Sequence, residues 1–198
     1  MGTFGNIKRK LQKYQYEEYW KNRGRTYYNK FVHSEGFKAQ ESLLIQILKS
    51  HENPIQFDSV FEVGCGFGRI TKIIEDNFHP KQYDALDISE QQIEHAKKLT
   101  KNVNYILSDF SKFTSTQEYD LVIISEVLMH IPDPLIEEFV IKALKMSKKF
   151  LITIDIAEKK NLPDSKHMTY HNYNKLFSNF SHKEHDTGFN QLIHVIRK

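Results

Sequence analysis

Cysteine is almost absent from this sequence. Cys65 is the single cysteine, so the chain cannot form an internal disulfide and has no thiol cluster for zinc or an iron–sulfur centre. No apolar run approaches the roughly 20 residues of a membrane-spanning helix, and no apolar segment follows the basic N-terminal residues, as a secretory signal requires. Asn6 stands where the myristoylation pattern requires serine or threonine. We therefore expect a soluble, cytoplasmic protein without a membrane partner.

Glycine is also scarce, with eight residues in 198, and its placement is uneven. Gly64, Gly66 and Gly68 lie within five positions, between an apolar run that predicts a strand and residues 69–76, whose pattern predicts a helix. Glycine lets the backbone of a strand-to-helix turn approach a ligand where any Cβ atom would collide with it. The cluster therefore predicts a site for a nucleotide-like molecule.

Length and patterning predict one α/β domain. A chain of 198 residues with 39% hydrophobic and 27% charged residues can bury one sizeable core. Runs that predict strands alternate with runs that predict helices: strands at 58–63, 82–87, 103–107, 119–124 and 149–155, and helices at 36–51, 67–77, 89–100, 133–146 and 170–178. This alternation predicts a doubly wound, mostly parallel sheet with helices on both faces. Residues 182–187 and 189–197 flank Gly188 and predict an antiparallel C-terminal hairpin, which makes seven strands.

The N-terminal region differs from the rest in charge and in aromatic content. Residues 1–30 carry eight lysines and arginines against two glutamates, and residues 4–37 hold nine of the 25 aromatic residues. We expect residues 1–36 to form an N-terminal helical extension that serves as an aromatic, basic lid, ahead of a domain at 37–198. Two alternatives remain: an arm that attracts phosphate, or a solvated helix that its aromatic residues anchor to the sheet.

Polar residues follow the next two predicted strands. Asp87 ends the second strand, 19 residues beyond Gly68, and Ser108 and Asp109 end the third. An acid at the tip of the second strand can accept both hydroxyls of a ribose, and polar residues after the third can meet an adenine edge. A dinucleotide fingerprint would place its third glycine where this chain has Arg69. The pattern predicts an adenosine-containing ligand other than a dinucleotide.

The run Glu62-x-Gly64-x-Gly66-x-Gly68 resembles the first motif of the class I S-adenosylmethionine-dependent methyltransferases. The resemblance covers about residues 58–197, including Asp87, Asp109, the fourth-strand motif at 119–131 and the closing hairpin. It implies S-adenosylmethionine as cofactor and S-adenosylhomocysteine as product. The residues that it implies for cofactor binding are Glu62, Gly64, Cys65, Gly66, Gly68, Asp87, Ile88, Ser108, Asp109, Phe110 and Ser125.

Methyl transfer is an in-line displacement, so the protein must hold an electron pair about 3 to 3.5 Å from the methyl group and exclude water. A general base helps when the acceptor is a hydroxyl group or a protonated amine. His130 and Glu126, after the fourth strand, are the catalytic candidates, and the alternative for His130 is a cofactor-shaping role.

Aromatic and histidine residues on two segments are the candidates for binding the acceptor. They are Tyr19, Trp20, Tyr27, Tyr28 and His33 near the N-terminus, and His167, Tyr170 and His171 after the fifth strand. Two of the latter, His167 and His171, have the i, i+4 spacing of a helical metal pair, but no acidic third-ligand motif accompanies them, so we expect no metal site.

Residues after the fourth strand narrow the acceptor class. Enzymes that methylate exocyclic nucleic-acid amines carry Asn or Asp followed by two prolines and an aromatic residue there, whereas this chain has Ser125-Glu126-Val127-Leu128. A catalytic cysteine for pyrimidine carbon-5 chemistry is also missing. We therefore predict methylation of an oxygen or nitrogen atom of a small molecule. The alternatives are an RNA or protein substrate guided by the basic N-terminal arm, and a non-catalytic cofactor-binding regulator.

Overall fold

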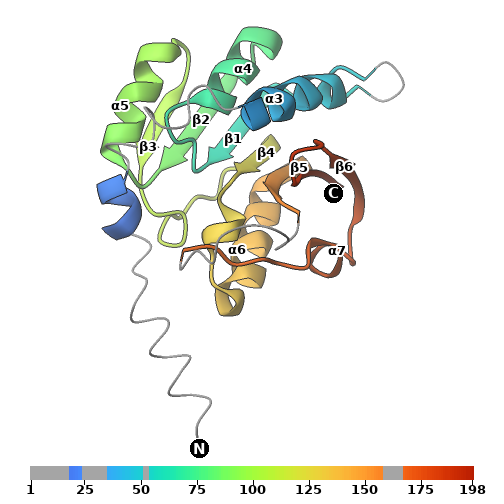
Figure 1. Cartoon of the computed structure of the whole chain (residues 1–198). Helices are drawn as coiled ribbons and strands as arrows, with labels where there is room; N and C mark the ends of the chain where they lie inside the picture. The colour runs from blue at the N-terminus through green and yellow to red at the C-terminus, as the bar shows by residue number, and fades with distance from the viewer. Residues whose placement is uncertain (1–17, 24–34, 51–53, 158–166) are drawn as a thin grey trace, which may run out of the picture.

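Seven strands form one mixed sheet in the computed structural model, which describes residues 18–23, 35–50, 54–157 and 167–198 (Figure 1). The strands are β1 (Ser59–Val63), β2 (Gln82–Asp87), β3 (Asn104–Leu107), β4 (Tyr119–Ser125), β5 (Ser147–Ile156), β6 (Ser181–Asp186) and β7 (Gln191–Arg197). Their order is β3-β2-β1-β4-β5-β7-β6. Strands β1 to β5 pair in parallel, and β7 runs antiparallel to both β5 and β6. The predicted fold class is confirmed.

Helices cover both faces of this sheet. They are α3 (Glu35–Leu48), α4 (Arg69–Phe78), α5 (Glu90–Leu99), α6 (Asp133–Met146) and α7 (Tyr173–Leu176), with a 3₁₀ turn, η1, at Leu128–His130 and a short helical segment at 18–23. Helices α3 and α4 pack on one face of the sheet, and α6 and α7 pack on the other. None of the described helices combines the length and the apolar character needed to cross a bilayer.

The central strands are buried on both faces, which explains why they are continuously apolar. Within β4, Leu121 and Ile123 belong to the core under α3 and α4, whereas Val122 and Ile124 belong to the core under α6. Successive side chains of a strand point to opposite faces, so one short strand contributes to both cores. The sheet is therefore held rigidly beneath the loops at its carboxyl edge.

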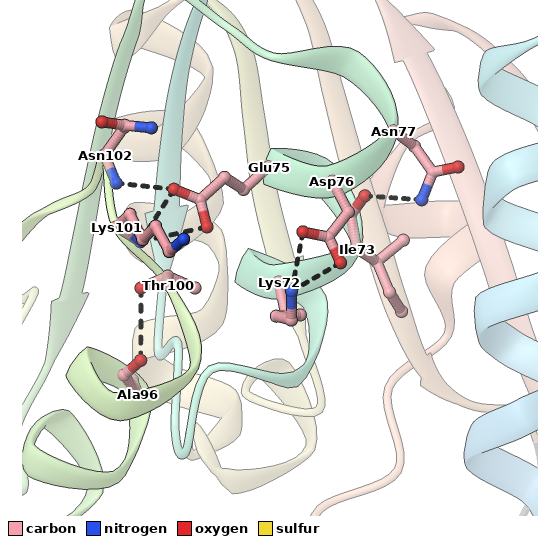
Figure 2. A network of polar contacts seen from close by, with 9 residues as sticks. All are labelled: Lys72, Ile73, Glu75, Asp76, Asn77, Ala96, Thr100, Lys101 and Asn102. Carbon is pink, nitrogen blue, oxygen red and sulfur yellow. Dashed lines mark hydrogen bonds and ion pairs between the residues drawn. The ribbon is translucent and has the colours of Figure 1, made fainter.

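Helices α4 and α5 lie side by side and are linked at their far ends. Figure 2 shows the Glu75 carboxylate, at the end of α4, accepting hydrogen bonds from the backbone amides of Lys101 (2.9 Å) and Asn102 (2.6 Å), after α5. On the solvent side of α4, Lys72 pairs with Asp76 one helical turn later. Such an exposed i, i+4 pair adds only about 0.3 to 0.5 kcal/mol. That pair lies within one helix, whereas the Glu75 hydrogen bonds connect α4 to the residues that follow α5.

His194 of β7 is fully buried, and neither ring nitrogen has a hydrogen-bond partner in the described part of the chain. The Tyr173 ring of α7 lies 5.3 Å away, and on β6 the His182 ring lies at 6.0 Å and Glu184 Oε2 at 3.9 Å from Nδ1. Burial, helped by the charges of His182 and His185, lowers the pKa of His194 from 6.5 to about 4. The His194 side chain is therefore neutral in the folded protein at pH 7.

We expect the free energy of unfolding to fall as the pH drops from 6.5 towards 4. Over that range the unfolded chain binds a proton at position 194 and the folded chain does not, so acid favours unfolding. Urea denaturation at pH 7.5 and pH 5 measures the difference. His194→Leu should reduce it, and His79→Asn, at an exposed histidine, should not. An unchanged pH dependence in His194→Leu would contradict this account.

Candidate cofactor and acceptor site

A pocket lies at the carboxyl edge of the sheet, where the ends of β1, β2, β3 and β4 meet. Its wall includes all of the predicted cofactor residues except Gly68, which is the N-cap of α4 behind the turn. Parallel strands direct their carboxyl ends to the same edge, so residues far apart in the sequence converge there. Topology therefore brings the predicted site together.

The glycine turn adopts left-handed backbone at each of its three glycines, with φ of 71° at Gly64, 55° at Gly66 and 88° at Gly68. The amides of Gly64 and Cys65 donate to the Leu86 carbonyl at 2.7 and 3.0 Å, which ties the turn to β2. A Cβ atom on Gly64 would lie 2.3 Å from the Val127 side chain, whereas one on Gly66 would meet nothing within 4 Å. The turn thus presents bare backbone to open space in the pocket.

Asp87 closes the turn from the neighbouring strand. Its Oδ2 accepts from the Gly66 amide and its Oδ1 from the Ser89 amide, both at 2.8 Å. Burial raises the pKa of this carboxyl above its ordinary value, and the amides oppose that rise. A carboxylate has about four acceptor positions, so it keeps capacity for ligand hydroxyls. Ribose binding by Asp87 stays a prediction, as does a contact from Ile88, which also lines the pocket.

Glu62 lies beneath the turn and is buried, at 1% exposure. Its Oε2 accepts from the hydroxyls of Thr71 and Tyr83, both at 2.7 Å. Burial raises the pKa of Glu62 to about 7, although these two hydrogen bonds oppose the rise. Glu62 is part of β1 and also lines the pocket, so its hydrogen bonds connect α4 and β2 to the pocket wall.

Ser108, Asp109 and Phe110 form the wall beyond β3. Asp109 Oδ1 accepts from the Ser111 amide at 2.8 Å, so its side chain also caps the turn that follows. From α6, Lys142 Nζ donates to the carbonyls of Phe110 (2.5 Å) and Ser111 (3.0 Å). Lys142, which sequence reasoning missed, thus fixes this wall from α6.

His130, in the η1 turn, lines the pocket and is 8% exposed. Its Nδ1 lies 2.8 Å from the His167 carbonyl, which can only accept, so Nδ1 carries the proton and Nε2 remains an acceptor. Burial lowers the pKa of His130 to about 4. The ring is therefore a neutral imidazole at pH 7, with its acceptor nitrogen as the one suited to take a proton.

Two of the predicted acceptor-binding residues stand close to His130. The Trp20 ring lies 4.5 Å from the His130 ring and lines the pocket. His167 stacks on His130 at 5.6 Å and on Tyr19 at 5.0 Å. Contact of any of these rings with an acceptor stays a prediction.

Two other predicted acceptor residues, Tyr170 and His171, are not part of the pocket wall. His171 Nε2 faces the carbonyls of Leu128 (2.9 Å) and Ile131 (3.0 Å), so it supports the η1 turn from below. Neither His171 nor Tyr170 is among the pocket-lining residues, and Tyr170 has a buried hydroxyl without a hydrogen-bond partner in the described chain. Tyr27, Tyr28 and His33 lie outside the described residues. Among the residues that the structure describes, no cluster of three potential ligands could hold a metal ion.

Glu126 is positioned by residues that sequence reasoning missed. Its Oε1 accepts from Gln40 of α3 at 2.9 Å and from Gln191 of β7 at 2.7 Å. Gln40 Oε1 in turn accepts from Arg69 Nη2 at 2.7 Å, and Arg69 lies 3.5 Å from the Ser125 hydroxyl. Gln40 gave a signal, because it occupies the buried stripe of α3 together with apolar residues. The contacts made by Arg69 and Gln191 gave no such signal in the sequence.

Residues 60–149 match the family model described as a methyltransferase domain. The ubiquinone biosynthesis O-methyltransferase of Rickettsia bellii (strain OSU 85-389) is 31% identical over 107 residues, which cover 53% of this chain and 44% of that protein. The corresponding enzyme of Rickettsia canadensis (strain McKiel) is 27% identical over 132 residues, or 58% of this chain and 55% of that protein. The chain therefore spans about half the length of these curated relatives.

Two solved structures share the architecture over most of the chain. Magnesium protoporphyrin IX methyltransferase from Synechocystis PCC 6803 with bound SAH has a TM-score of 0.73 at 15% identity, and the alignment covers 92% of this chain and 98% of that one. N-methyltransferase NodS from Bradyrhizobium japonicum WM9 in complex with S-adenosyl-l-homocysteine has a TM-score of 0.68 at 15% identity, with coverage of 84% and 89%. These likenesses show the fold.

Proposed function

We propose that this chain, which has a class I methyltransferase domain, transfers a methyl group from S-adenosylmethionine to an oxygen or nitrogen atom of a small molecule in the cytoplasm. The observation that carries the proposal is that one pocket joins the glycine turn, Asp87 and Asp109 to His130 and Glu126. Relatives named as an O-methyltransferase and an N-methyltransferase support both acceptor atoms.

The residues present fit the cofactor. Gly66 offers open space where a Cβ atom would stand, so a ligand can approach the backbone directly. Asp87 would hold the ribose, and Ser108, Asp109 and Phe110 would hold the adenine. The cofactor supplies a methyl group on a positively charged sulfur. Burial of the pocket's inner wall, including Glu62 and His130, would keep water from that group.

The acceptor end would be formed by His130, Glu126 and Trp20. Neutral His130, with Nε2 as its acceptor nitrogen, can take a proton from a hydroxyl or an amine during transfer. Trp20, packed on the His130 ring, would close the pocket from the N-terminal side. We accordingly propose that residues 1–36 serve as a lid over a methyltransferase domain at 37–198.

The function is tested in two stages. Cofactor binding is measured by titration with S-adenosylhomocysteine. The titration is monitored by calorimetry and by the fluorescence of Trp20, the only tryptophan in the chain. Transfer of tritiated methyl groups is then measured against a panel of phenols, catechols, carboxylic acids and amines, with RNA and protein as further arms. We expect labelling in the small-molecule arms. Cofactor binding with labelling of RNA or protein alone, or with none at all, would contradict the proposal.

His130→Asn is the informative variant for the base. Asparagine can still donate a hydrogen bond to the His167 carbonyl, but it has no nitrogen atom at the place of His130 Nε2. If His130 acts as a base, turnover should fall by about 100-fold or more, while affinity for S-adenosylhomocysteine stays within about twofold. Equal losses in turnover and affinity would instead assign His130 a cofactor-shaping role.

A further inference from the structure

We propose that Glu126 determines specificity at the acceptor end of the pocket and that Gln40 and Gln191 are its positioning residues. Their two amides hold the Glu126 carboxylate, and the carboxylate would accept a hydrogen bond from the acceptor. The pocket then selects acceptors whose reacting atom carries a hydrogen, an amine or a hydroxyl group. The inference rests on the proposed function, because it concerns the acceptor of that reaction.

Two amides converge on a single oxygen of Glu126. Gln40 Nε2 approaches Oε1 at 2.9 Å from α3, and Gln191 Nε2 approaches it at 2.7 Å from β7. These donors are 86 and 65 residues away in the sequence. Hydrogen bonds to an ionised carboxylate are stronger than those between neutral groups. Three separate elements therefore hold one carboxylate in one orientation.

Arg69 sets the direction of these hydrogen bonds. A guanidinium group only donates, and Arg69 Nη2 lies 2.7 Å from Gln40 Oε1, so that oxygen must accept. The Gln40 amide nitrogen consequently points to Glu126 and donates, which requires Glu126 Oε1 to be an acceptor. Arg69 is itself held, with its guanidinium 4.0 Å over the Phe37 ring. The chain from Arg69 through Gln40 thus fixes the amide nitrogen of Gln40 on the Glu126 carboxyl group at the pocket wall.

The backbone at Glu126 is strained in support of this arrangement. Its φ of 56° is left-handed, which is unfavourable for a residue with a Cβ atom, and glycine would relieve the strain. The Glu126 amide donates to the Ile154 carbonyl at 2.7 Å, which holds the strained residue on β5. Strained residues that the surrounding structure holds in place gather at functional sites. The chain thus has a glutamate at a position where its backbone conformation is unfavourable.

Topology puts Glu126 at the end of the pocket away from the adenine wall. Along the sheet edge, Asp109 follows β3, Asp87 ends β2, Gly64 follows β1 and Glu126 follows β4. These strands are neighbours in that order, and all four residues line the same pocket. A ligand with its adenine near Asp109 and its ribose at Asp87 would direct its reactive sulfur towards β4. Glu126 therefore meets the transferred methyl group and the atom that receives it.

Sinefungin tests the proposal without knowledge of the natural acceptor. In this cofactor analogue, a carbon that bears a protonated amine replaces the sulfur and its methyl group, so an N–H donor stands in the place of the methyl group and points towards the acceptor end of the pocket. We expect the chain to bind sinefungin about tenfold more tightly than S-adenosylhomocysteine, as one hydrogen bond to a charged group allows. Calorimetry measures both dissociation constants, and their ratio is the readout.

Three substitutions should bring that ratio towards one. Glu126→Gln removes the charge, and Gln191→Met removes one positioning amide. Gln40→Glu still accepts from Arg69 but cannot donate to Glu126, so it tests the direction of the network. The control Gln46→Met, on the exposed side of α3, should keep the wild-type ratio. A role in folding alone would lower the melting temperature and leave the ratio unchanged.

The outcomes separate this inference from the proposed function. If S-adenosylhomocysteine binds but the wild-type ratio is near one, or the ratio survives all three substitutions, Glu126 does not determine specificity and the proposed function stands. If neither ligand binds, the proposed function fails, and the inference fails with it.

Discussion

Gly68→Ala should lower the free energy of unfolding by about 2 to 5 kcal/mol and abolish measurable binding of S-adenosylhomocysteine. Gly68 has a φ of 88°, and an added Cβ atom would lie 2.7 Å from the Cβ and 2.8 Å from the Cα of Ala96. Ala96 is fully buried in α5, which α4 accompanies side by side, so its backbone cannot move aside freely. Urea denaturation and calorimetry measure the two effects.

Gly66→Ala is the matched control for this prediction. Gly66 is also left-handed, with a φ of 55°, but an added Cβ atom would meet nothing within 4 Å. Its substitution should cost only the backbone strain of about 1 to 2 kcal/mol. Equal destabilisation by the two alanines would show that the contact of Gly68 with α5 is not what requires glycine there.

Asp87→Asn should weaken binding of S-adenosylhomocysteine by about 100-fold or more. The carboxylate accepts from the backbone amides of Gly66 and Ser89, one on each oxygen. Asparagine has one oxygen, so its NH₂ group must face one of these amides, and that amide loses its partner. The same substitution removes the acceptor proposed for the ribose. The glycine turn and the ribose site would therefore be damaged together.

Asp84→Asn separates this effect from general destabilisation. Asp84 lies on the same strand, is also buried, and accepts hydrogen bonds from Tyr119, Gln82 and Asn104, but it does not line the pocket. We expect it to lower the melting temperature while affinity for S-adenosylhomocysteine stays within about threefold. Comparable losses of affinity in both variants would contradict a direct role for Asp87.

Local backbone requirements made much of the site predictable. Gly64, Gly66 and Gly68 need left-handed backbone within a short segment, and that need is visible as a glycine cluster. Alternating strand and helix patterns predict parallel order, and parallel order places Asp87 at the same edge as the glycines. The prediction could therefore be made without knowing any long-range contact.

Contacts between distant side chains could not be predicted in the same way. Lys142 is one of several lysines on its part of the chain, and only the packing of α6 against the loop after β3 directs its Nζ to the Phe110 carbonyl. His171 shows the reverse case. Its place in the sequence suggested the acceptor pocket, but the fold turns its ring towards the backbone of η1.

By itself, the amino-acid sequence determined the order of the elements, the parallel sheet with its closing hairpin and the glycine turn, because each depends on patterns within a few residues. Tertiary structure alone decided how Glu126 is used. Arg69, Gln40 and Gln191 come from two helices and the last strand, and their hydrogen bonds exist only after the sheet has brought those elements together. A hydrogen bond depends on distance and direction in space, which residue spacing along the chain does not specify.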